Sequence, residues 1–298
     1  MTKANGERNG QGTTGVNPAT YEPVVAPRER TFELSSEVPR AKPEMTTPPR
    51  PGEEPTSSDI ARNFDDLTYQ RAKAIIGRYP QSRSALLPML HLVQSVQGYV
   101  SPQGIVFCAE QLGLSTAEVS AVTTFYTMYK RRPNGEHLVS VCTNTLCAAL
   151  GGDAIYQKLC ERLGSGGKPL GHEQTSGEPG GTGSVTIEHA ECLAACDLAP
   201  VLQVNYEYYD NQSVESATEL VEALRRGERP APTRGAPLTD WRTVERELAG
   251  FFDDLPSAAD GPSAAEQTLV GARLAESRGW RAPEMPEHAE LPPVPEKK

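Results

Sequence analysis

The distribution of proline most limits what this chain can fold into. Of its 26 prolines, nine lie in residues 1–57 and ten in residues 229–298, which leaves seven for the long stretch between them. Proline-rich runs favour extended backbone, and these two segments have too little apolar surface to offset the entropy of ordering. We therefore predict a disordered tail over residues 1–58 and a mostly disordered tail with short helices over 229–298. The packed protein is then about residues 59–228, enough for a modest core.

Hydrophobic periodicity divides the packed region into two halves. Residues 67–130 carry apolar side chains at helical spacing and predict helices over about 67–79, 84–97, 102–112 and 115–124. Two of these starts are marked, one by Ser101 followed by Pro102 and one by the capping box Ser115–Glu118. Pro88 favours a later start for the second helix. Short helices with brief loops predict a small bundle over residues 59–132.

The second half, residues 133–228, has the pattern of a mixed αβ domain. It predicts, in order, a strand over 137–142, a helix over 147–162, strands over 185–188 and 201–205, and a helix over 216–226. The fold class is therefore α+β, with an N-terminal helical bundle followed by an αβ sandwich of thioredoxin-like size. Eight glycines lie in residues 164–183. Because no strand leads into them and no Gly-Lys-Ser/Thr ending follows, we interpret this segment as a flexible surface loop.

Charge and hydropathy exclude two classes of function. The formal net charge is −10, and no cluster of Lys and Arg is dense enough for a nucleic-acid footprint. No apolar stretch approaches the roughly 20 residues of a membrane span, and the first residues have no apolar core for export. We therefore expect a cytoplasmic protein that does not bind nucleic acid and does not insert into the membrane, so that any membrane association runs through partners.

The cysteines form two pairs with metal-ligand character. Six cysteines in a reducing compartment indicate metal ligation or redox chemistry rather than disulfides. Cys142 and Cys147 form a C-x4-C pair where a predicted strand ends, and Cys192 and Cys196 form a C-x3-C pair after the next predicted strand. An iron–sulfur cluster needs four thiolates that converge from loops, with backbone amides free to hydrogen-bond sulfur. The small residues beside these cysteines allow such a close approach: Ala148, Ala149, Ala194 and Ala195.

Three other interpretations of the cysteines compete with this one. Structural zinc also takes four thiolates, although its ligand pairs usually have two residues between the cysteines. A thioredoxin-like redox dithiol needs C-x-x-C, which this sequence lacks. Unligated cysteines are common in protein cores, and we interpret Cys108 and Cys160 in that way because each lies singly on an apolar helical face.

The residues around the two pairs resemble a known family. The segments that carry the resemblance are Val122-Thr-Thr-Phe-Tyr-Thr-Met-Tyr129, Val141-Cys-Thr-Asn-Thr-Leu-Cys147, Glu191-Cys-Leu-Ala-Ala-Cys-Asp-Leu-Ala-Pro200, Gln203–Asn205 and Tyr208-Tyr209. In kind and order they are similar to the E subunit of bacterial NADH:quinone oxidoreductase, respiratory complex I, over about residues 67–228. The resemblance implies a helical bundle followed by a thioredoxin-like [2Fe–2S] domain, with Cys142, Cys147, Cys192 and Cys196 as the ligands of one cluster.

The resemblance also implies an electron-transfer subunit with no complete active site of its own. Its partners would be a flavoprotein subunit that holds FMN and binds NADH, and other peripheral-arm subunits at the cytoplasmic face of the inner membrane. The chain departs from the family at Leu146, where proline is frequent, and at Ala194, where glycine is usual. Two rivals are the equivalent subunit of an NAD-linked hydrogenase or formate dehydrogenase, and a zinc-stapled thioredoxin-like interaction module.

Other residues carry weaker predictions. An aromatic stripe is interpreted as packing between the bundle and the αβ domain, with docking of the flavin subunit as the alternative: Phe125, Tyr126, Met128 and Tyr129. His137 and His189 lie near the ligand-bearing strands, and we treat them as ordinary because no cysteine ligand is missing. Residues 241–251 predict an amphipathic helix that docks on a partner.

Overall fold

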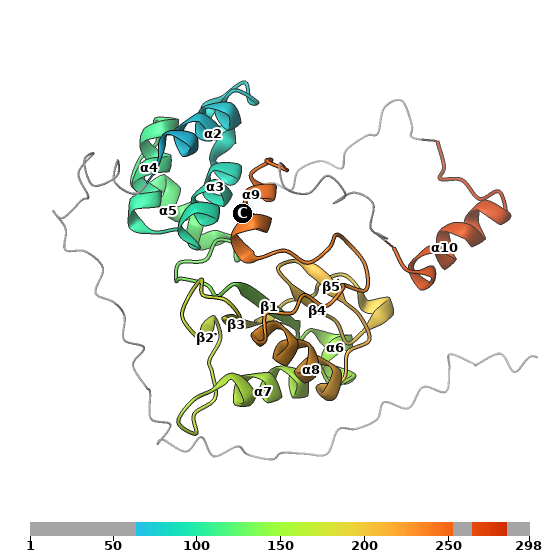
Figure 1. Cartoon of the computed structure of the whole chain (residues 1–298). Coiled ribbons are helices and arrows are strands. Elements are labelled where there is room, and N and C mark those ends of the chain that lie inside the picture. The colour runs from blue at the N-terminus through green and yellow to red at the C-terminus, as the bar shows by residue number, and fades with distance from the viewer. Residues whose placement is uncertain (1–63, 253–263, 285–298) are drawn as a thin grey trace, which may run out of the picture. The chain divides into compact units, whose positions relative to one another are not determined.

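The computed structural model describes residues 64–252 and 264–284, which are coloured in Figure 1. The tail predicted for residues 1–58 lies outside the described residues, and so do residues 253–263 and 285–298 of the tail predicted after residue 228. The described part of the chain begins with helices and continues with a sheet that carries the cysteines.

The first part is a bundle of α2 (Asp66–Ile76), α3 (Leu86–Gln97), α4 (Pro102–Leu112) and α5 (Thr116–Phe125), with a 3-10 turn, η2 (Ser82–Ala85), before α3. Both predicted starts are confirmed. The Ser101 hydroxyl accepts a hydrogen bond from the Gly104 amide at 3.0 Å, and α5 opens with the reciprocal capping box. Pro88 falls in the first turn of α3, where proline is tolerated. The bundle core centres on side chains that are fully buried, among them Met89, Leu90 and Phe107.

The second part is built on a five-stranded mixed sheet with the strand order β2-β3-β1-β4-β5. Its strands are β1 (His137–Cys142), β2 (Gln174–Ser176), β3 (Val185–Ala190), β4 (Leu202–Val204) and β5 (Glu207–Tyr209). β1 and β3 are parallel, whereas the other neighbouring pairs are antiparallel. β1 lies at the centre and is buried along its whole length, as expected of a strand covered on both faces.

Helices α7 (Gly152–Leu163) and α8 (Val214–Arg225) cover one face of the sheet (Figure 1). Val139 of β1 points to this side and shares a core with Leu159 of α7 and Val221 of α8. The next side chain points the other way because side chains alternate along a strand. Leu138 therefore packs on the opposite face, against Trp241.

Helix α9 (Trp241–Leu248) joins that opposite face to the bundle by packing against α3. The Trp241 side chain is 1% exposed, and its indole Nε1 donates to the Gly98 carbonyl at 2.8 Å. Glu245 is fully buried, accepts a hydrogen bond from Gln94 at 2.8 Å and lies 2.6 Å from His91 Nδ1. The amphipathic helix predicted here is present, and its apolar face packs within its own chain, against the sheet and the bundle.

Two local predictions were wrong, and one strand was missed. The helix expected over 147–162 is two helices, α6 (Thr145–Ala149) and α7. Gly151 separates them because its left-handed conformation, with φ +109°, interrupts the helical backbone. The glycine-rich segment, interpreted as a loop, contains β2, and a further strand, β5, which was not predicted, follows β4. Both strands have three residues, and pairing with β3 and β4 defines them rather than a local pattern.

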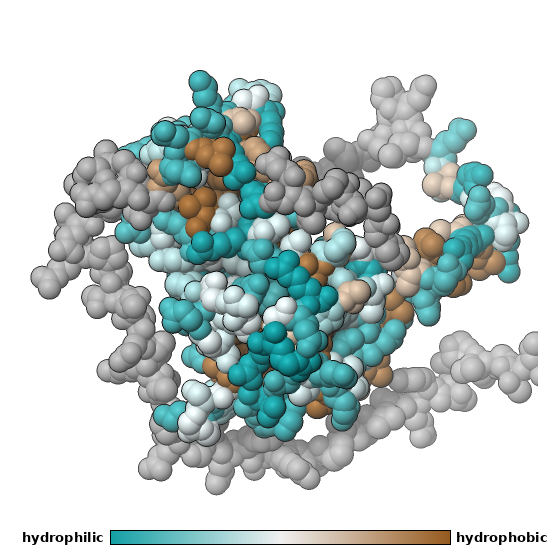
Figure 2. Space-filling model, viewed as in Figure 1, coloured by the Kyte–Doolittle hydropathy of each residue, from teal (hydrophilic) through white to brown (hydrophobic). Residues whose placement is uncertain are grey.

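Helix α10 (Glu266–Ser277) is the last one described. None of its residues is buried, and Val270 and Leu274 are 62% and 41% exposed; Figure 2 shows hydrophobic side chains among hydrophilic ones along it. In the parts of the chain that the structure describes, no one helix has both the length and the apolar composition to cross a membrane. Of the described helices, only α4 and α5 taken together have that length and composition, and the pair is bent by 119°.

Candidate metal centre

The carboxyl ends of β1 and β3 bring the two cysteine pairs to one edge of the sheet. Parallel neighbours end at the same edge, and the register pairs Cys142 with Ala190, the last residue of β3. The Cys142 amide donates to the Val201 carbonyl at 3.1 Å, and the Thr143 amide donates to the Ala190 carbonyl at 3.1 Å. The Cys192–Cys196 loop follows β3 directly and therefore begins beside the end of β1.

The first pair is buried. Cys142 ends β1 and Cys147 lies in α6, and each is 2% exposed. Asn144 caps α6, since its side-chain oxygen accepts a hydrogen bond from the Thr145 amide at 2.9 Å. Burial, followed by contact with the Cys142 thiol, raises the pKa of Cys147 to about 11. The Cys147 thiol thus keeps its proton at neutral pH, and a metal that binds there must displace it.

Gly152 allows α7 to start against the backbone of this pair. A Cβ atom on Gly152 would lie 2.5 Å from the Cys142 carbonyl oxygen and 2.9 Å from the Cys147 carbonyl oxygen. Both contacts are with backbone atoms, which cannot rotate away as a side chain does. Close approach, rather than an unusual turn, is what requires glycine at this position.

The second pair is exposed. The Sγ atoms of Cys192 and Cys196 lie 3.5 Å apart. The Ala194 amide donates to Cys192 Sγ at 3.4 Å, and Ala194 adopts a left-handed φ of +58°. This conformation explains why glycine is usual at the position in the family that the sequence resembles. Hydrogen bonding with the Cys192 thiol is the first cause that raises the pKa of Cys196.

The two pairs share one apolar environment. The buried pair packs in a small cluster, against which further apolar side chains lie: Ala195 and Val201 within it, and Leu193, Ala199 and Tyr208 beside it. Charge on Cys196 raises the pKa of Cys147, and charge on Cys142 raises that of Cys196, so the pairs are near enough to interact electrostatically. The structure therefore brings together the four cysteines that the sequence singled out, as two close pairs at one sheet edge.

A cleft of about 390 Å³ opens beside Cys192. Lys130, 3% exposed, binds two carboxylates there, Glu173 at 3.2 Å and Glu188 at still closer range. Among the described residues, the one group of three or more His, Cys, Asp and Glu side chains whose ligand atoms all lie within 4.8 Å of one another is His172, Glu173 and Glu188. The Lys130 ammonium forms ion pairs with both carboxylates, so this group is part of an ion-pair network. His189, whose ring lies 4.2 Å from that of His172, also lines the cleft.

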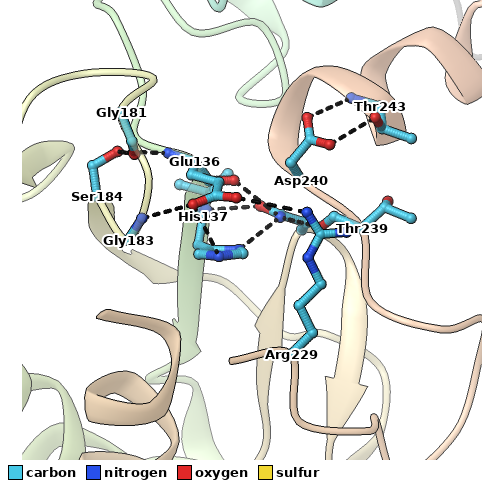
Figure 3. A network of polar contacts seen from close by, with 11 residues as sticks. Glu136, His137, Gly181, Gly183, Ser184, Arg229, Thr239, Asp240 and Thr243 are labelled. Carbon is cyan, nitrogen blue, oxygen red and sulfur yellow. Dashed lines mark hydrogen bonds and ion pairs between the residues drawn. The ribbon is translucent and has the colours of Figure 1, made fainter. Parts of the chain in front are cut away.

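His137 lies at the other end of β1 from Cys142, in the polar network of Figure 3. Its side chain is 1% exposed, and burial lowers its pKa. Its Nδ1 is 3.3 Å from the Asn205 amide nitrogen, and its Nε2 is 3.8 Å from the Glu136 carboxylate. Glu136 in turn accepts a hydrogen bond from the Gly183 amide at 2.7 Å and pairs with Arg229 at 3.7 Å. This network joins loops around the start of β1 and is remote from the cysteines.

The remaining residues singled out in the sequence have mixed outcomes. Cys108 and Cys160 are core thiols as predicted, 0% and 5% exposed. The aromatic stripe does not pack as a unit between the bundle and the sheet. Tyr129 is buried, but the other members are exposed: Phe125 at 77%, Tyr126 at 44% and Met128 at 37%. Sequence reasoning missed Gly152 and the Tyr208 hydroxyl, which donates to the Leu193 carbonyl at 2.9 Å; no local pattern marks either one, because both act through space.

Comparisons with known proteins agree on one family. The model of the thioredoxin-like [2Fe–2S] ferredoxin family matches residues 72–225. The E subunit of NADH-quinone oxidoreductase from Mycobacterium tuberculosis (strain ATCC 25618 / H37Rv) is 55% identical over 215 residues, which are 72% of this chain and 81% of that protein. The E subunit of the NADH-quinone oxidoreductase from Rickettsia prowazekii (strain Madrid E) is 34% identical over 162 residues, 53% of this chain and 86% of that protein.

A solved structure is also similar, at a lower level. It is the crystal structure of NAD+-reducing [NiFe]-hydrogenase in the air-oxidized state, with a TM-score of 0.40 and 17% identity. The similarity covers 47% of this chain and 23% of that chain. A likeness this weak does not support a functional assignment.

Proposed function

Because the chain belongs to the thioredoxin-like [2Fe–2S] ferredoxin family, we propose that it is the electron-transfer subunit of an NADH:quinone oxidoreductase and carries one [2Fe–2S] cluster on Cys142, Cys147, Cys192 and Cys196. The observation that carries the proposal is the convergence of a buried and an exposed thiol pair at one sheet edge. We infer two domains: an N-terminal domain over 59–132, whose helical bundle the structure describes from residue 64 on, and the cluster domain over 133–228. The partner is a flavoprotein subunit with FMN and NADH, within a complex at the cytoplasmic face of the inner membrane.

The spacing of the thiols supports a binuclear cluster over a single metal ion. Zinc with bonds of about 2.3 Å in a tetrahedron would hold all four sulfurs about 3.8 Å apart. No three of the four cysteine thiols, all of them described residues, lie within 4.8 Å of one another. Cys192 and Cys196 are nevertheless 3.5 Å apart, and Cys147 contacts Cys142. Two close pairs set farther from each other fit two irons, each with two protein thiolates.

The protein supplies ligands, hydrogen bonds and insulation. When bound, a [2Fe–2S] cluster accepts and donates single electrons, and NADH oxidation itself belongs to the flavin of the partner. The Ala194 amide already donates to Cys192 Sγ at 3.4 Å, the kind of bond that stabilises charge on sulfur. Val201 and Ala195 keep water from the buried pair. The exposed Cys192–Cys196 side is then the side from which a partner's redox group approaches.

The curated relatives favour this complex over the rivals. Proteins at 55% and 34% identity are named as the E subunit of NADH-quinone oxidoreductase, and the chain covers most of each of them. The zinc-stapled module is disfavoured by the thiol spacing. The hydrogenase or formate dehydrogenase unit is disfavoured by the names of these relatives.

The test is reduction by NADH in the assembled complex. The chain is co-purified with its flavoprotein partner, NADH is added under anaerobic conditions, and EPR spectra are recorded for the wild type and for Cys142→Ser, Cys147→Ser, Cys192→Ser and Cys196→Ser. We expect a [2Fe–2S] signal in the wild type that is lost or altered in each serine variant. Cys160→Ala is the matched control, because this core cysteine lies outside the four, and it should keep the wild-type signal. A wild-type signal in all four serine variants would contradict the proposal.

A further inference from the structure

The chain after α8 returns to the sheet of the cluster domain, at the edge formed by β5. The returning segment lies beyond residues 72–225, which the family model matches. The Thr233 amide donates to the Tyr208 carbonyl at 2.8 Å, and Tyr208 and Arg234 form an isolated antiparallel bridge. The Asp210 amide donates to the Thr233 hydroxyl at 3.1 Å. These bonds extend the sheet past β5 and fix the backbone of Arg234.

The Arg234 guanidinium is held on the face of Tyr208. Its Cζ lies 4.3 Å from the centroid of the Tyr208 ring, a cation–π geometry. Its Nη2 is 3.1 Å from Asp210 Oδ1, and the two side chains are only 11% and 5% exposed. Arg234 Nε is buried and has no hydrogen-bond partner among the described residues. A buried cation that leaves one N–H unpaired costs free energy, so packing alone does not account for arginine here.

The same tyrosine holds the exposed ligand loop. The Tyr208 hydroxyl donates to the Leu193 carbonyl at 2.9 Å, and its ring packs against the cluster that contains Cys142 and Cys147. Leu193 lies between Cys192 and Ala194, the residue with φ +58°. Tyr208 therefore links the buried thiol pair, the exposed thiol pair and the Arg234 cation.

We propose that Arg234 is a positioning residue of the metal centre, which acts through Tyr208 on the Cys192–Cys196 loop and whose charge raises the reduction potential of the bound cluster. The inference rests on the proposed function. Reduction adds one negative charge to the cluster, and a cation in a poorly solvated site stabilises the reduced form more than the oxidised form. Asp210 partly offsets this effect. Loss of Arg234 leaves the carboxylate uncompensated, and loss of the Asp210 charge leaves the guanidinium uncompensated.

The pair therefore predicts shifts of opposite sign. In redox titrations of the cluster followed by EPR on the full chain, Arg234→Gln should lower the midpoint potential and Asp210→Asn should raise it. A role in folding alone does not reverse sign between two variants that break the same ion pair. Tyr208→Phe removes only the hydroxyl, and we expect altered EPR g values and faster loss of the cluster. Arg234→Lys keeps the charge and should return the potential toward the wild-type value.

Arg162→Gln is the matched control. It makes the same change of charge in an ion pair with Glu222 whose arginine is 56% exposed. Arg162 lies ten residues along α7 from Gly152, about 15 Å from the start of that helix, and its variant should keep the wild-type potential.

The outcomes separate this inference from the proposed function. A wild-type chain without a cluster contradicts the proposed function. A cluster whose potential is the same in the wild type, Arg234→Gln and Asp210→Asn overturns only the inference. If Arg234→Gln does not hold a cluster, the other two variants test the inference. An unchanged midpoint potential in Asp210→Asn, together with an unchanged EPR spectrum in Tyr208→Phe, overturns the inference.

Discussion

Gly152 offers the sharpest test of how the fold positions the buried thiol pair. In Gly152→Ala the new Cβ would lie 2.5 Å from the Cys142 carbonyl oxygen, 0.9 Å short of the 3.4 Å at which ordinary contact begins. Overpacking costs about 1–3 kcal/mol, and contacts with backbone on two sides put this case near about 3 kcal/mol. Alanine recovers up to about 1 kcal/mol of helix propensity. The net loss is then about 2 kcal/mol, or about 8–16 °C in Tm for a domain of about 100 residues.

The assay combines thermal unfolding with the visible absorption of the cluster. Because the displaced atoms are the carbonyls of two ligands, Gly152→Ala should lower both Tm and cluster content. Gly151→Ala is the control: it has φ +109° but open space around the new Cβ, so conformational strain of about 1–2 kcal/mol lowers Tm while the spectrum stays intact. Wild-type Tm and spectrum in Gly152→Ala would refute the close approach of α7 to the cysteine backbone.

Two further predictions concern single residues of the cluster domain. Ala194→Gly removes the left-handed strain of about 1–2 kcal/mol at φ +58° and loses about 0.4–1 kcal/mol through the more flexible unfolded chain. We therefore expect stabilisation of up to about 1.6 kcal/mol in denaturant unfolding, and a loss of stability would contradict it. Burial lowers the pKa of His137 below 6.5, so its contribution to stability is present above pH 6.5 and falls as the pH drops through the folded-state pKa. His137→Gln should therefore flatten the fall in denaturation midpoint below pH 6.5, and equal slopes in both proteins would count against a buried neutral imidazole.

Local signals were sufficient for the parts of the fold that local chemistry controls. Ser101 and Ser115 marked helix starts because a side-chain oxygen next to a free amide is a property of a few neighbouring residues. The β-rich sequence of residues 137–142 marked the strand that forms β1. The four cysteines could be singled out as candidate ligands for the same reason, because their spacing is a local property of the sequence and thiol chemistry is specific.

Features that depend on distant partners were not predictable in this way. β2 and β5 have three residues each and exist because β3 and β4 pair with them. Trp241 lies in the segment predicted to be a tail, but it is buried, and its indole donates a hydrogen bond to the Gly98 carbonyl, 143 residues earlier in the chain. The contacts of Tyr208 with Leu193 and Arg234 join three segments that no periodicity connects. Tertiary contact, which a single sequence does not display, decides all of these.

Iron and acid-labile sulfide analysis of the purified chain, with EPR after reduction, tests the central claim most directly. Four thiols arranged as two close pairs predict about two irons and about two sulfides per chain, and an EPR signal that appears on reduction. Zinc in place of iron, without sulfide and without a signal, would contradict a [2Fe–2S] centre on Cys142, Cys147, Cys192 and Cys196.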